Sequence, residues 1–230
     1  MKVSVMISIL ILVLLCWCSV SRNSIWLTEI AAMEDTVSKS PFKARPHLNL
    51  GVFSVEQGKL EQAVREFRTA QALDPKGATA HYDMGFAYER MGLLDRAAEE
   101  YQRALGIDPD KLRARFNLAR VRLAQGSLAQ AEAEYRSVLA YAPQSPEAHT
   151  NLGVVYYYQG RIDLAIQEHQ QALRYRPDYA DAHTNLGNAY LALQRFEAAR
   201  DEYETALRIN PLDAETRNNL SVLYQRWQPR

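Results

Sequence analysis

A proline recurs every 34 residues along most of this chain, and this fixed period constrains the fold more than any other feature of the sequence. The motif HTNLG also occurs twice at the same interval, at 149–153 and 183–187. A period of this length indicates one supersecondary unit that is copied along the chain and stacked on its neighbours. The prolines of the series are Pro41, Pro75, Pro109, Pro143, Pro177 and Pro211.

Other residue types keep the same frame. Each copy has a leucine or methionine followed by a small residue, two further small residues, and one ring-bearing residue at a fixed place. The leucine series is Leu50, Met84, Leu118, Leu152, Leu186 and Leu220, and the ring series is Phe67, Tyr101, Tyr135, His169 and Tyr203. We call the ring series the wedge position, because a ring there is expected to wedge between neighbouring helix pairs.

Within one copy, residues 81–110, apolar side chains recur three and four positions apart on both sides of Gly92, which predicts two amphipathic helices joined by a turn. Gly58, Gly126 and Gly160 mark the same turn in other copies. The proline then ends the second helix. One such hairpin cannot bury its apolar face alone, so stacked copies share a continuous core.

These residues resemble the tetratricopeptide-repeat pattern, and the chain is identified as a member of that family. The resemblance implies an all-α, right-handed superhelical solenoid of helix-turn-helix repeats at 44–213. Gln194 replaces the turn glycine of the last repeat, and Arg122 stands where other copies have Ser54 or a tyrosine. The repeats are 44–77, 78–111, 112–145, 146–179 and 180–213, with an N-terminal capping helix within 23–43 and a C-terminal capping helix within 214–230.

Residues 1–22 are strongly apolar, with no charge between Lys2 and Arg22. As a helix, residues 3–21 reach about 28 Å at about 1.5 Å per residue, which is enough to span a bilayer core. We expect a single-pass transmembrane anchor. A cleaved signal peptide, which gives a secreted or periplasmic protein, is the main alternative, and a lipoprotein site at Cys16 or Cys18 is the third.

Residues 22–47 also resemble the segment that joins the last membrane helix to the repeats in multi-pass, C-type glycosyltransferase-like proteins of the O-mannosyltransferase type. That resemblance implies repeats on the extracytoplasmic side and a polytopic membrane protein as one candidate partner. The acidic catalytic loop and the other spanning helices of that family have no counterpart here.

Composition and motifs argue against catalysis in this chain. The 27 basic and 27 acidic residues give a net charge of +0, and no basic cluster appears, so we expect no nucleic-acid partner. The only cysteines are Cys16 and Cys18. Four histidines, at 47, 81, 149 and 183, share one frame position, and successive repeats hold them too far apart for a common metal. We therefore predict a non-enzymatic chain without metal or cofactor.

The family resemblance implies that the first helices line a concave groove, with the residue before the Leu-Gly pair facing it. That ladder position holds Asn49, Asp83, Asn117, Asn151, Asn185 and Asn219. Carboxamides offer donors and acceptors that can pair with the backbone of an extended peptide. The series resembles the asparagine ladder of O-GlcNAc transferase, although asparagine as a mere consensus residue explains it equally well.

Neighbouring groove positions add one asparagine and a set of aromatic and arginine side chains. The aromatic and arginine types dominate interface energetics. These positions hold Tyr82, Phe86, Arg90, Arg113, Phe116, Arg120, Tyr157, Tyr158 and Asn188. The second and third repeats are the expected anchor region. Thr184 stands where the carboxylate clamp of chaperone-binding relatives needs a lysine, which argues against that mode of recognition.

The sequence thus predicts a membrane-anchored protein-interaction scaffold that binds an extended partner segment in its groove. Two alternatives remain: an accessory subunit or split C-terminal part of a membrane glycosyltransferase system, and a secreted soluble repeat protein.

Overall fold

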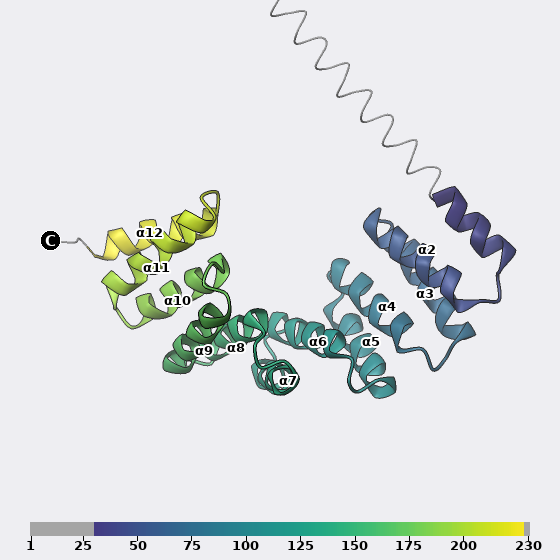
Figure 1. Ribbon diagram of the computed structural model, residues 1–230, viewed down its shortest axis with the longest axis horizontal. Coiled ribbons are helices and arrows are strands. Elements are labelled where there is room, and N and C mark those ends of the chain that lie inside the picture. Colours follow the sequence, from purple (N-terminus) through teal and green to yellow (C-terminus); the bar gives the residue numbers. More distant parts are fainter. Residues whose placement is uncertain (1–29, 228–230) are drawn as a thin grey trace, which may run out of the picture. The chain divides into compact units, whose positions relative to one another are not determined.

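The computed structural model describes residues 30–227, which form α-helices and short turns and contain no strand (Figure 1). The chain divides into two compact units, one up to Met91 and one from Gly92. The first unit contains a helix over residues 30–39, then α2 (Ala44–Glu56), α3 (Leu60–Leu73) and α4 (Ala78–Arg90). The all-α prediction is confirmed for this part of the chain.

The second unit begins with the second helix of a hairpin, continues with complete hairpins and ends with a single helix. Its helices are α5 (Leu94–Ile107), α6 (Leu112–Ala124), α7 (Leu128–Tyr141), α8 (Pro146–Tyr158), α9 (Ile162–Tyr175), α10 (Ala180–Ala192), α11 (Phe196–Ile209) and α12 (Ala214–Arg226). The even-numbered helices begin at the same interval that separates the prolines, so the period of the sequence is also the period of the fold.

The predicted anchor or signal segment at residues 1–22 lies outside the described residues. Among helices within residues 30–227, none combines the length and the apolar character that a bilayer crossing requires.

The turn inside each hairpin uses left-handed backbone geometry. Gly58, Gly92, Gly126 and Gly160 have φ between 72° and 76°, a region that glycine enters without steric cost. Gln194 adopts φ 57° at the equivalent place. The turn position predicted from the sequence is therefore confirmed, and the substitution at Gln194 keeps the turn geometry.

Glycine lets the two helices of a hairpin approach where the wedge ring crosses the first helix. A Cβ atom on Gly51 would lie 2.3 Å from the Phe67 ring, and one on Gly187 would lie 2.6 Å from the Tyr203 ring. Real Cβ atoms essentially never come this close. The wedge ring thus fills the space that the missing side chain leaves.

Histidines fasten the first helix of a hairpin to its second helix and to the preceding turn. Nδ1 of His149 donates to Glu168 at 2.7 Å, and its Nε2 donates to the backbone carbonyl of Pro143 at 3.0 Å. Since both ring nitrogens face acceptors, the doubly protonated ring suits the site. The same pair of contacts joins His47 to Glu66 and Pro41, His183 to Glu202 and Pro177, and, with an arginine, Arg115 to Glu134 and Pro109.

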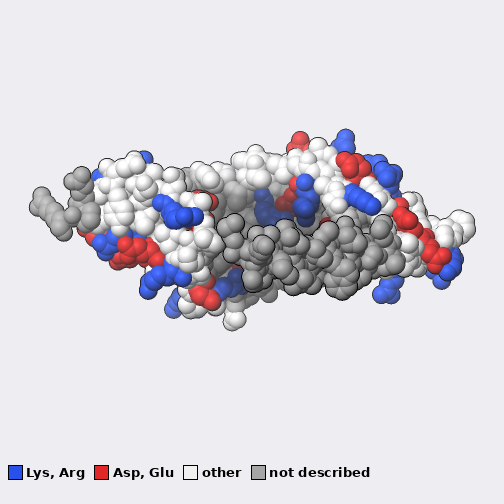
Figure 2. Space-filling view, turned by 90° about the horizontal axis from the view of Figure 1, so that it is seen from above, with Lys and Arg blue, Asp and Glu red and all other residues white. Residues whose placement is uncertain are grey.

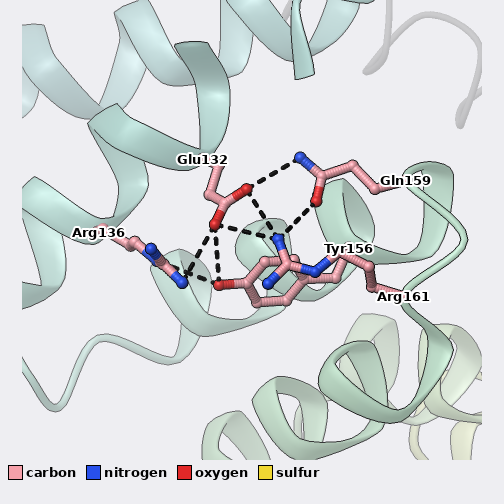
Figure 3. A network of polar contacts seen from close by, with 5 residues as sticks. All are labelled: Glu132, Arg136, Tyr156, Gln159 and Arg161. Carbon is pink, nitrogen blue, oxygen red and sulfur yellow. Dashed lines mark hydrogen bonds and ion pairs between the residues drawn. The ribbon is translucent and has the colours of Figure 1, made fainter. Parts of the chain in front are cut away.

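A polar network links α7 to the following hairpin (Figure 3). The Glu132 carboxylate accepts from Gln159 at 3.0 Å and from Arg161 at 3.1 Å, and it pairs with Arg136 at 3.1 Å. Arg136 also donates to the Tyr156 hydroxyl at 3.2 Å. The hydrogen bond from Gln159 and the charges of Arg136 and Arg161 outweigh burial and lower the pKa of Glu132. The network holds neighbouring repeats in register.

In the second unit the first helices of successive hairpins touch one another. Contacts join α6 with α8, α8 with α10, and α10 with α12, whereas among residues 92–227 no comparable contact joins α7 with α9 or α9 with α11. The stack therefore curves toward the side of the even-numbered helices. Any groove in this unit lies on their face.

The last helix, α12, covers the end of the stack. Leu223 is fully buried, and Trp227 stacks on Phe196 with ring centroids 6.0 Å apart. The Thr216 hydroxyl lies 2.6 Å from that of Thr184 in α10. α12 therefore packs against α10 and α11 in the way that the first helix of a following repeat would.

Candidate functional site

All six ladder residues lie on even-numbered helices, as the repeat frame requires. Asn49 in α2 is exposed, and the other five are half-buried. The Nδ2 atom of Asn117 donates to the Tyr101 hydroxyl at 3.4 Å, and that of Asn219 donates to Oδ1 of Asn188 at 3.0 Å. Some ladder side chains are therefore engaged within the protein.

A first cavity, of about 390 Å³, lies in the first unit between α2, α3 and α4. Phe67 is among its lining residues and is almost fully buried. We call it the Phe67 cavity; its lining residues are Val52, Val55, Glu56, Phe67, Tyr82, Asp83, Phe86 and Arg90. Four residues predicted for the groove are thus brought together around one apolar hollow with charged groups at its edge.

A second, smaller cavity, of about 90 Å³, lies in the second unit between α8, α9 and α10, with one residue from α12. We call it the His169 cavity; its lining residues are Val154, Tyr157, Tyr158, His169, Asn185, Asn188 and Glu215. Four predicted groove residues meet here as well. The rings of Tyr157 and Tyr158 contact edge to face at 5.9 Å.

The two cavities are the same place in different repeats. Six residues of the Phe67 cavity have their frame equivalents, three repeats later, in the His169 cavity. The pairs are Val52 and Val154, Val55 and Tyr157, Glu56 and Tyr158, Phe67 and His169, Asp83 and Asn185, and Phe86 and Asn188. The repeat backbone thus forms a cavity at the same place in different repeats, and the residues at the equivalent positions determine its chemical character.

Both cavities occur where the wedge residue lacks a tyrosine hydroxyl. The hydroxyl of Tyr203 donates to Oδ1 of Asn188 at 2.7 Å. Burial raises the pKa of Tyr203, which keeps the hydroxyl protonated as a donor. Phe67 and His169 have no atom at that distance along the side chain.

His169 is the most unusual wedge residue. It is 1% exposed, and its Nδ1 atom has no hydrogen-bond partner among the described residues. Burial lowers its pKa to about 3, so the ring is neutral near pH 7. The ring edge with Nδ1, Cε1 and Nε2 packs against Gly153. A buried polar atom without a partner costs about 1–3 kcal/mol.

The remaining predicted residues do not join either cavity. Arg113 and Arg120 are exposed on α6, and Asn151 is half-buried on α8. Phe116 packs edge-on against Tyr135, with centroids 5.6 Å apart, beside the core of the second unit. The predicted anchor residues of the third repeat therefore line neither of these two cavities.

Seven lining residues were not predicted for the groove, and two of them, Phe67 and His169, were predicted only as wedge residues. The other five are Val52, Val55, Glu56, Val154 and Glu215. Val52, Phe86 and Val154 share one frame position, so the choice of Phe86 could have been extended to its equivalents. Glu215 could not have been found this way, because its equivalents do not line the Phe67 cavity.

On the face drawn in Figure 2, basic and acidic side chains are interspersed over the described residues. Among residues 30–227 no group of three His, Cys, Asp or Glu side chains has the geometry of a metal site.

Comparison with protein families agrees with the repeat frame. A TPR repeat model matches residues 54–92 and 155–194, and two tetratricopeptide repeat models match residues 91–152 and 180–212.

Solved structures share the fold. The TPR protein YrrB, described as having an unusual peptide-binding site, aligns with a TM-score of 0.67 and 21% identity over 81% of this chain and 96% of its own. Cut9 in the APC/C hetero-tetramer Cut9–Hcn1 aligns with a TM-score of 0.72 and 23% identity over 86% of this chain and 40% of that one. At these identities the likeness establishes the fold alone.

Two curated relatives match a shorter segment. They are the human and mouse proteins named protein O-mannosyl-transferase TMTC1, each 33% identical over 72 residues. The match covers 31% of this chain and only 8% of each relative.

Proposed function

Since the chain belongs to the tetratricopeptide-repeat family, we propose that it is a non-enzymatic protein-interaction scaffold whose first-helix surface binds an extended segment of a protein partner. The observation that carries this proposal is the pair of equivalent cavities at Phe67 and His169. Eight of the residues that the sequence marked as groove residues line them.

The chemistry of these linings suits a peptide. The Phe67 cavity combines apolar walls with Glu56, Asp83 and Arg90, a mixture typical of sites that bury a side chain and fix its orientation with a few polar groups. In the second unit the carboxamides of Asn151 and Asn185 can serve backbone donors and acceptors alike. A segment bound to either unit in this way is held by its main chain and selected by the side chain that enters the cavity of that unit.

A selection of random peptides on the immobilised full chain tests the proposal. The variant Phe86→Ala/Asn151→Ala removes one aromatic wall and one ladder carboxamide without touching the His169 cavity. We expect peptides selected on either unit to bind this variant about tenfold more weakly, because the first unit loses an aromatic contact and the second unit loses a hydrogen-bonding carboxamide.

The matched control is Asn218→Ala, which removes an exposed carboxamide from α12 outside both cavities. Helicity by circular dichroism should be the same for all three proteins. Equal binding by the parent and the double variant would remove the groove as the site of recognition.

The apolar segment at residues 1–22 supports a finer proposal, that the scaffold is anchored in a membrane by one helix with its repeats on the extracytoplasmic side. Carbonate extraction of native membranes tests the anchor: an anchored chain stays in the membrane pellet. Release into the supernatant, with the apolar run missing from the mature chain, would favour a secreted or periplasmic protein.

A second candidate function follows from the TMTC1 match, which adds to the resemblance of residues 22–47. In this alternative the chain is an accessory subunit or split C-terminal part of a membrane glycosyltransferase system. It predicts co-purification with a polytopic membrane protein in mild detergent, and a chain that purifies from native membranes without such a partner contradicts it.

A further inference from the structure

The His169 cavity occupies the place that a tyrosine hydroxyl fills in another repeat. Where the wedge residue is Tyr101, its hydroxyl accepts a hydrogen bond from the ladder residue Asn117 at 3.4 Å. The equivalents of this pair, two repeats later, are His169 and Asn185, and both line the cavity. An imidazole ring ends short of the position of a phenol oxygen, so the ladder carboxamide faces open space instead of a hydroxyl.

The lining of this cavity offers both kinds of hydrogen-bonding group. His169 contributes its buried ring to the lining, although Nδ1 of that ring packs against Gly153 and lacks a partner among the described residues. Oδ1 of Asn188 already accepts from Tyr203 and Asn219, so that carboxamide has its N–H groups to offer. Asn185 adds a donor and an acceptor, and Glu215 adds a carboxylate at the exposed edge.

Size limits what can enter. At about 90 Å³ the cavity is smaller than the apolar cavity of about 150 Å³ that is known to admit benzene, so a full aromatic side chain does not fit. The neutral His169 ring provides no charge to pair with an anion. The occupant that matches volume and lining is therefore a short, uncharged side chain that both donates and accepts.

We propose that the His169 cavity is a specificity subsite that receives a hydroxyl or carboxamide side chain, from serine, threonine or asparagine, of the partner segment. This inference rests on the proposed function, since it assigns one position within the bound peptide. The wedge residue then determines whether a repeat has this subsite, because a tyrosine at that position fills the space with its hydroxyl.

The substitution His169→Tyr tests this, because tyrosine is the chain's own residue at three other wedge positions and fits against a glycine at Tyr203. Random peptides are selected on the full chain and on the variant. For the parent we expect enrichment of serine, threonine or asparagine at one peptide position. For His169→Tyr we expect that enrichment to disappear, and the parent's peptides to bind about tenfold more weakly.

Two further variants are compared with the parent. One is a control in the first unit, and the other distinguishes the effect of the histidine nitrogens from the effect of the open hydroxyl position. Phe67→Tyr makes the matching change in the first unit, and it should keep the enrichment for serine, threonine or asparagine. His169→Phe removes the ring nitrogens and leaves the hydroxyl position open, so the enriched position should shift to alanine or valine. It also carries the test if His169→Tyr loses its helical circular dichroism signal.

The outcomes distinguish the groove from the subsite. If the parent enriches no peptide, or if Phe86→Ala/Asn151→Ala binds the enriched peptides as well as the parent does, the groove proposal fails and the subsite fails with it. If that double variant loses binding while His169→Tyr keeps the same peptides at the same affinity, the groove stands and the subsite is refuted.

Discussion

At the scale of single residues, the repeat depends on pairs of side chains that are chosen together. A glycine in the first helix faces the wedge ring of the second, and a frame histidine or arginine faces a glutamate. In each pair, the contribution of one residue to stability depends on the presence of the other. Substitutions at one member should therefore have effects that its own chemistry does not predict.

Gly187→Ala is expected to destabilise the fold. Its Cβ would lie 2.6 Å from the Tyr203 ring, which is fully buried and cannot move away without disturbing α12. Overpacking of this kind costs about 1–3 kcal/mol. Gly106→Ala in α5 is the control: nothing lies within 4 Å of the added Cβ, and helix propensity should raise stability by up to about 1 kcal/mol. Urea unfolding of both variants measures the difference, and equal effects would contradict this expectation.

The histidine contacts make stability depend on pH. The Glu168 hydrogen bond raises the pKa of His149 above 6.5, and for His183 the contacts to Glu202 and the Pro177 carbonyl outweigh burial and raise its pKa too. A raised folded-state pKa gives stabilisation that is complete below about pH 6.5 and is lost as the pH rises through the folded-state value. Buried His169 acts in the opposite sense, but only as the pH falls below about 6.5.

The melting temperature should therefore fall as the pH rises above about 6.5 and passes through the raised pKa values of His149 and His183. The isosteric double variant Glu168→Gln/Glu202→Gln removes the charges that hold the protons on His149 and His183, so its melting temperature should change less over this range. A slope identical to that of the parent would show that these contacts do not hold the protons.

At the scale of elements, the hairpin turn is the point where one backbone requirement recurs in every repeat. Four turns meet it with glycine, and the last meets it with Gln194 at φ 57°. A residue with a Cβ destabilises the folded state by about 1–2 kcal/mol when its backbone is in the left-handed region. Glycine avoids that cost, but its greater freedom in the unfolded chain offsets part of the gain in stability.

Gln194→Gly should therefore stabilise the protein by roughly 0.5–1 kcal/mol. Gln57 is the matched control, because it is also exposed in a hairpin turn but has φ −82°. Gln57→Gly should leave stability unchanged or lower it. If both glutamine substitutions shift the urea midpoint in the same direction by the same amount, backbone strain at Gln194 is not the cause.

At the scale of the whole molecule, the constant interval between the prolines and the apolar pattern within one copy predicted the helices and their turns, and the family resemblance assigned the ladder to the first helix of each repeat. Residue-to-residue hydrogen bonds were harder to foresee. The histidine contacts had a signal that was missed, since Glu66, Glu100, Glu134, Glu168 and Glu202 repeat in the same frame. No sequence signal marked the two cavities by itself. They depend on how far the side chain at the wedge position reaches toward the ladder residue, and only a tyrosine hydroxyl reaches that far.

The first-helix surface with its two cavities is the proposed binding site of a partner segment. Hydrogen–deuterium exchange on the full chain, with and without a peptide enriched by the selection, tests this most directly. We expect slower exchange in α2 and α4 around the Phe67 cavity or in α8 and α10 around the His169 cavity, with α5 and α7 unchanged. Protection confined to α5, α7 or α11, which line neither cavity, would contradict it.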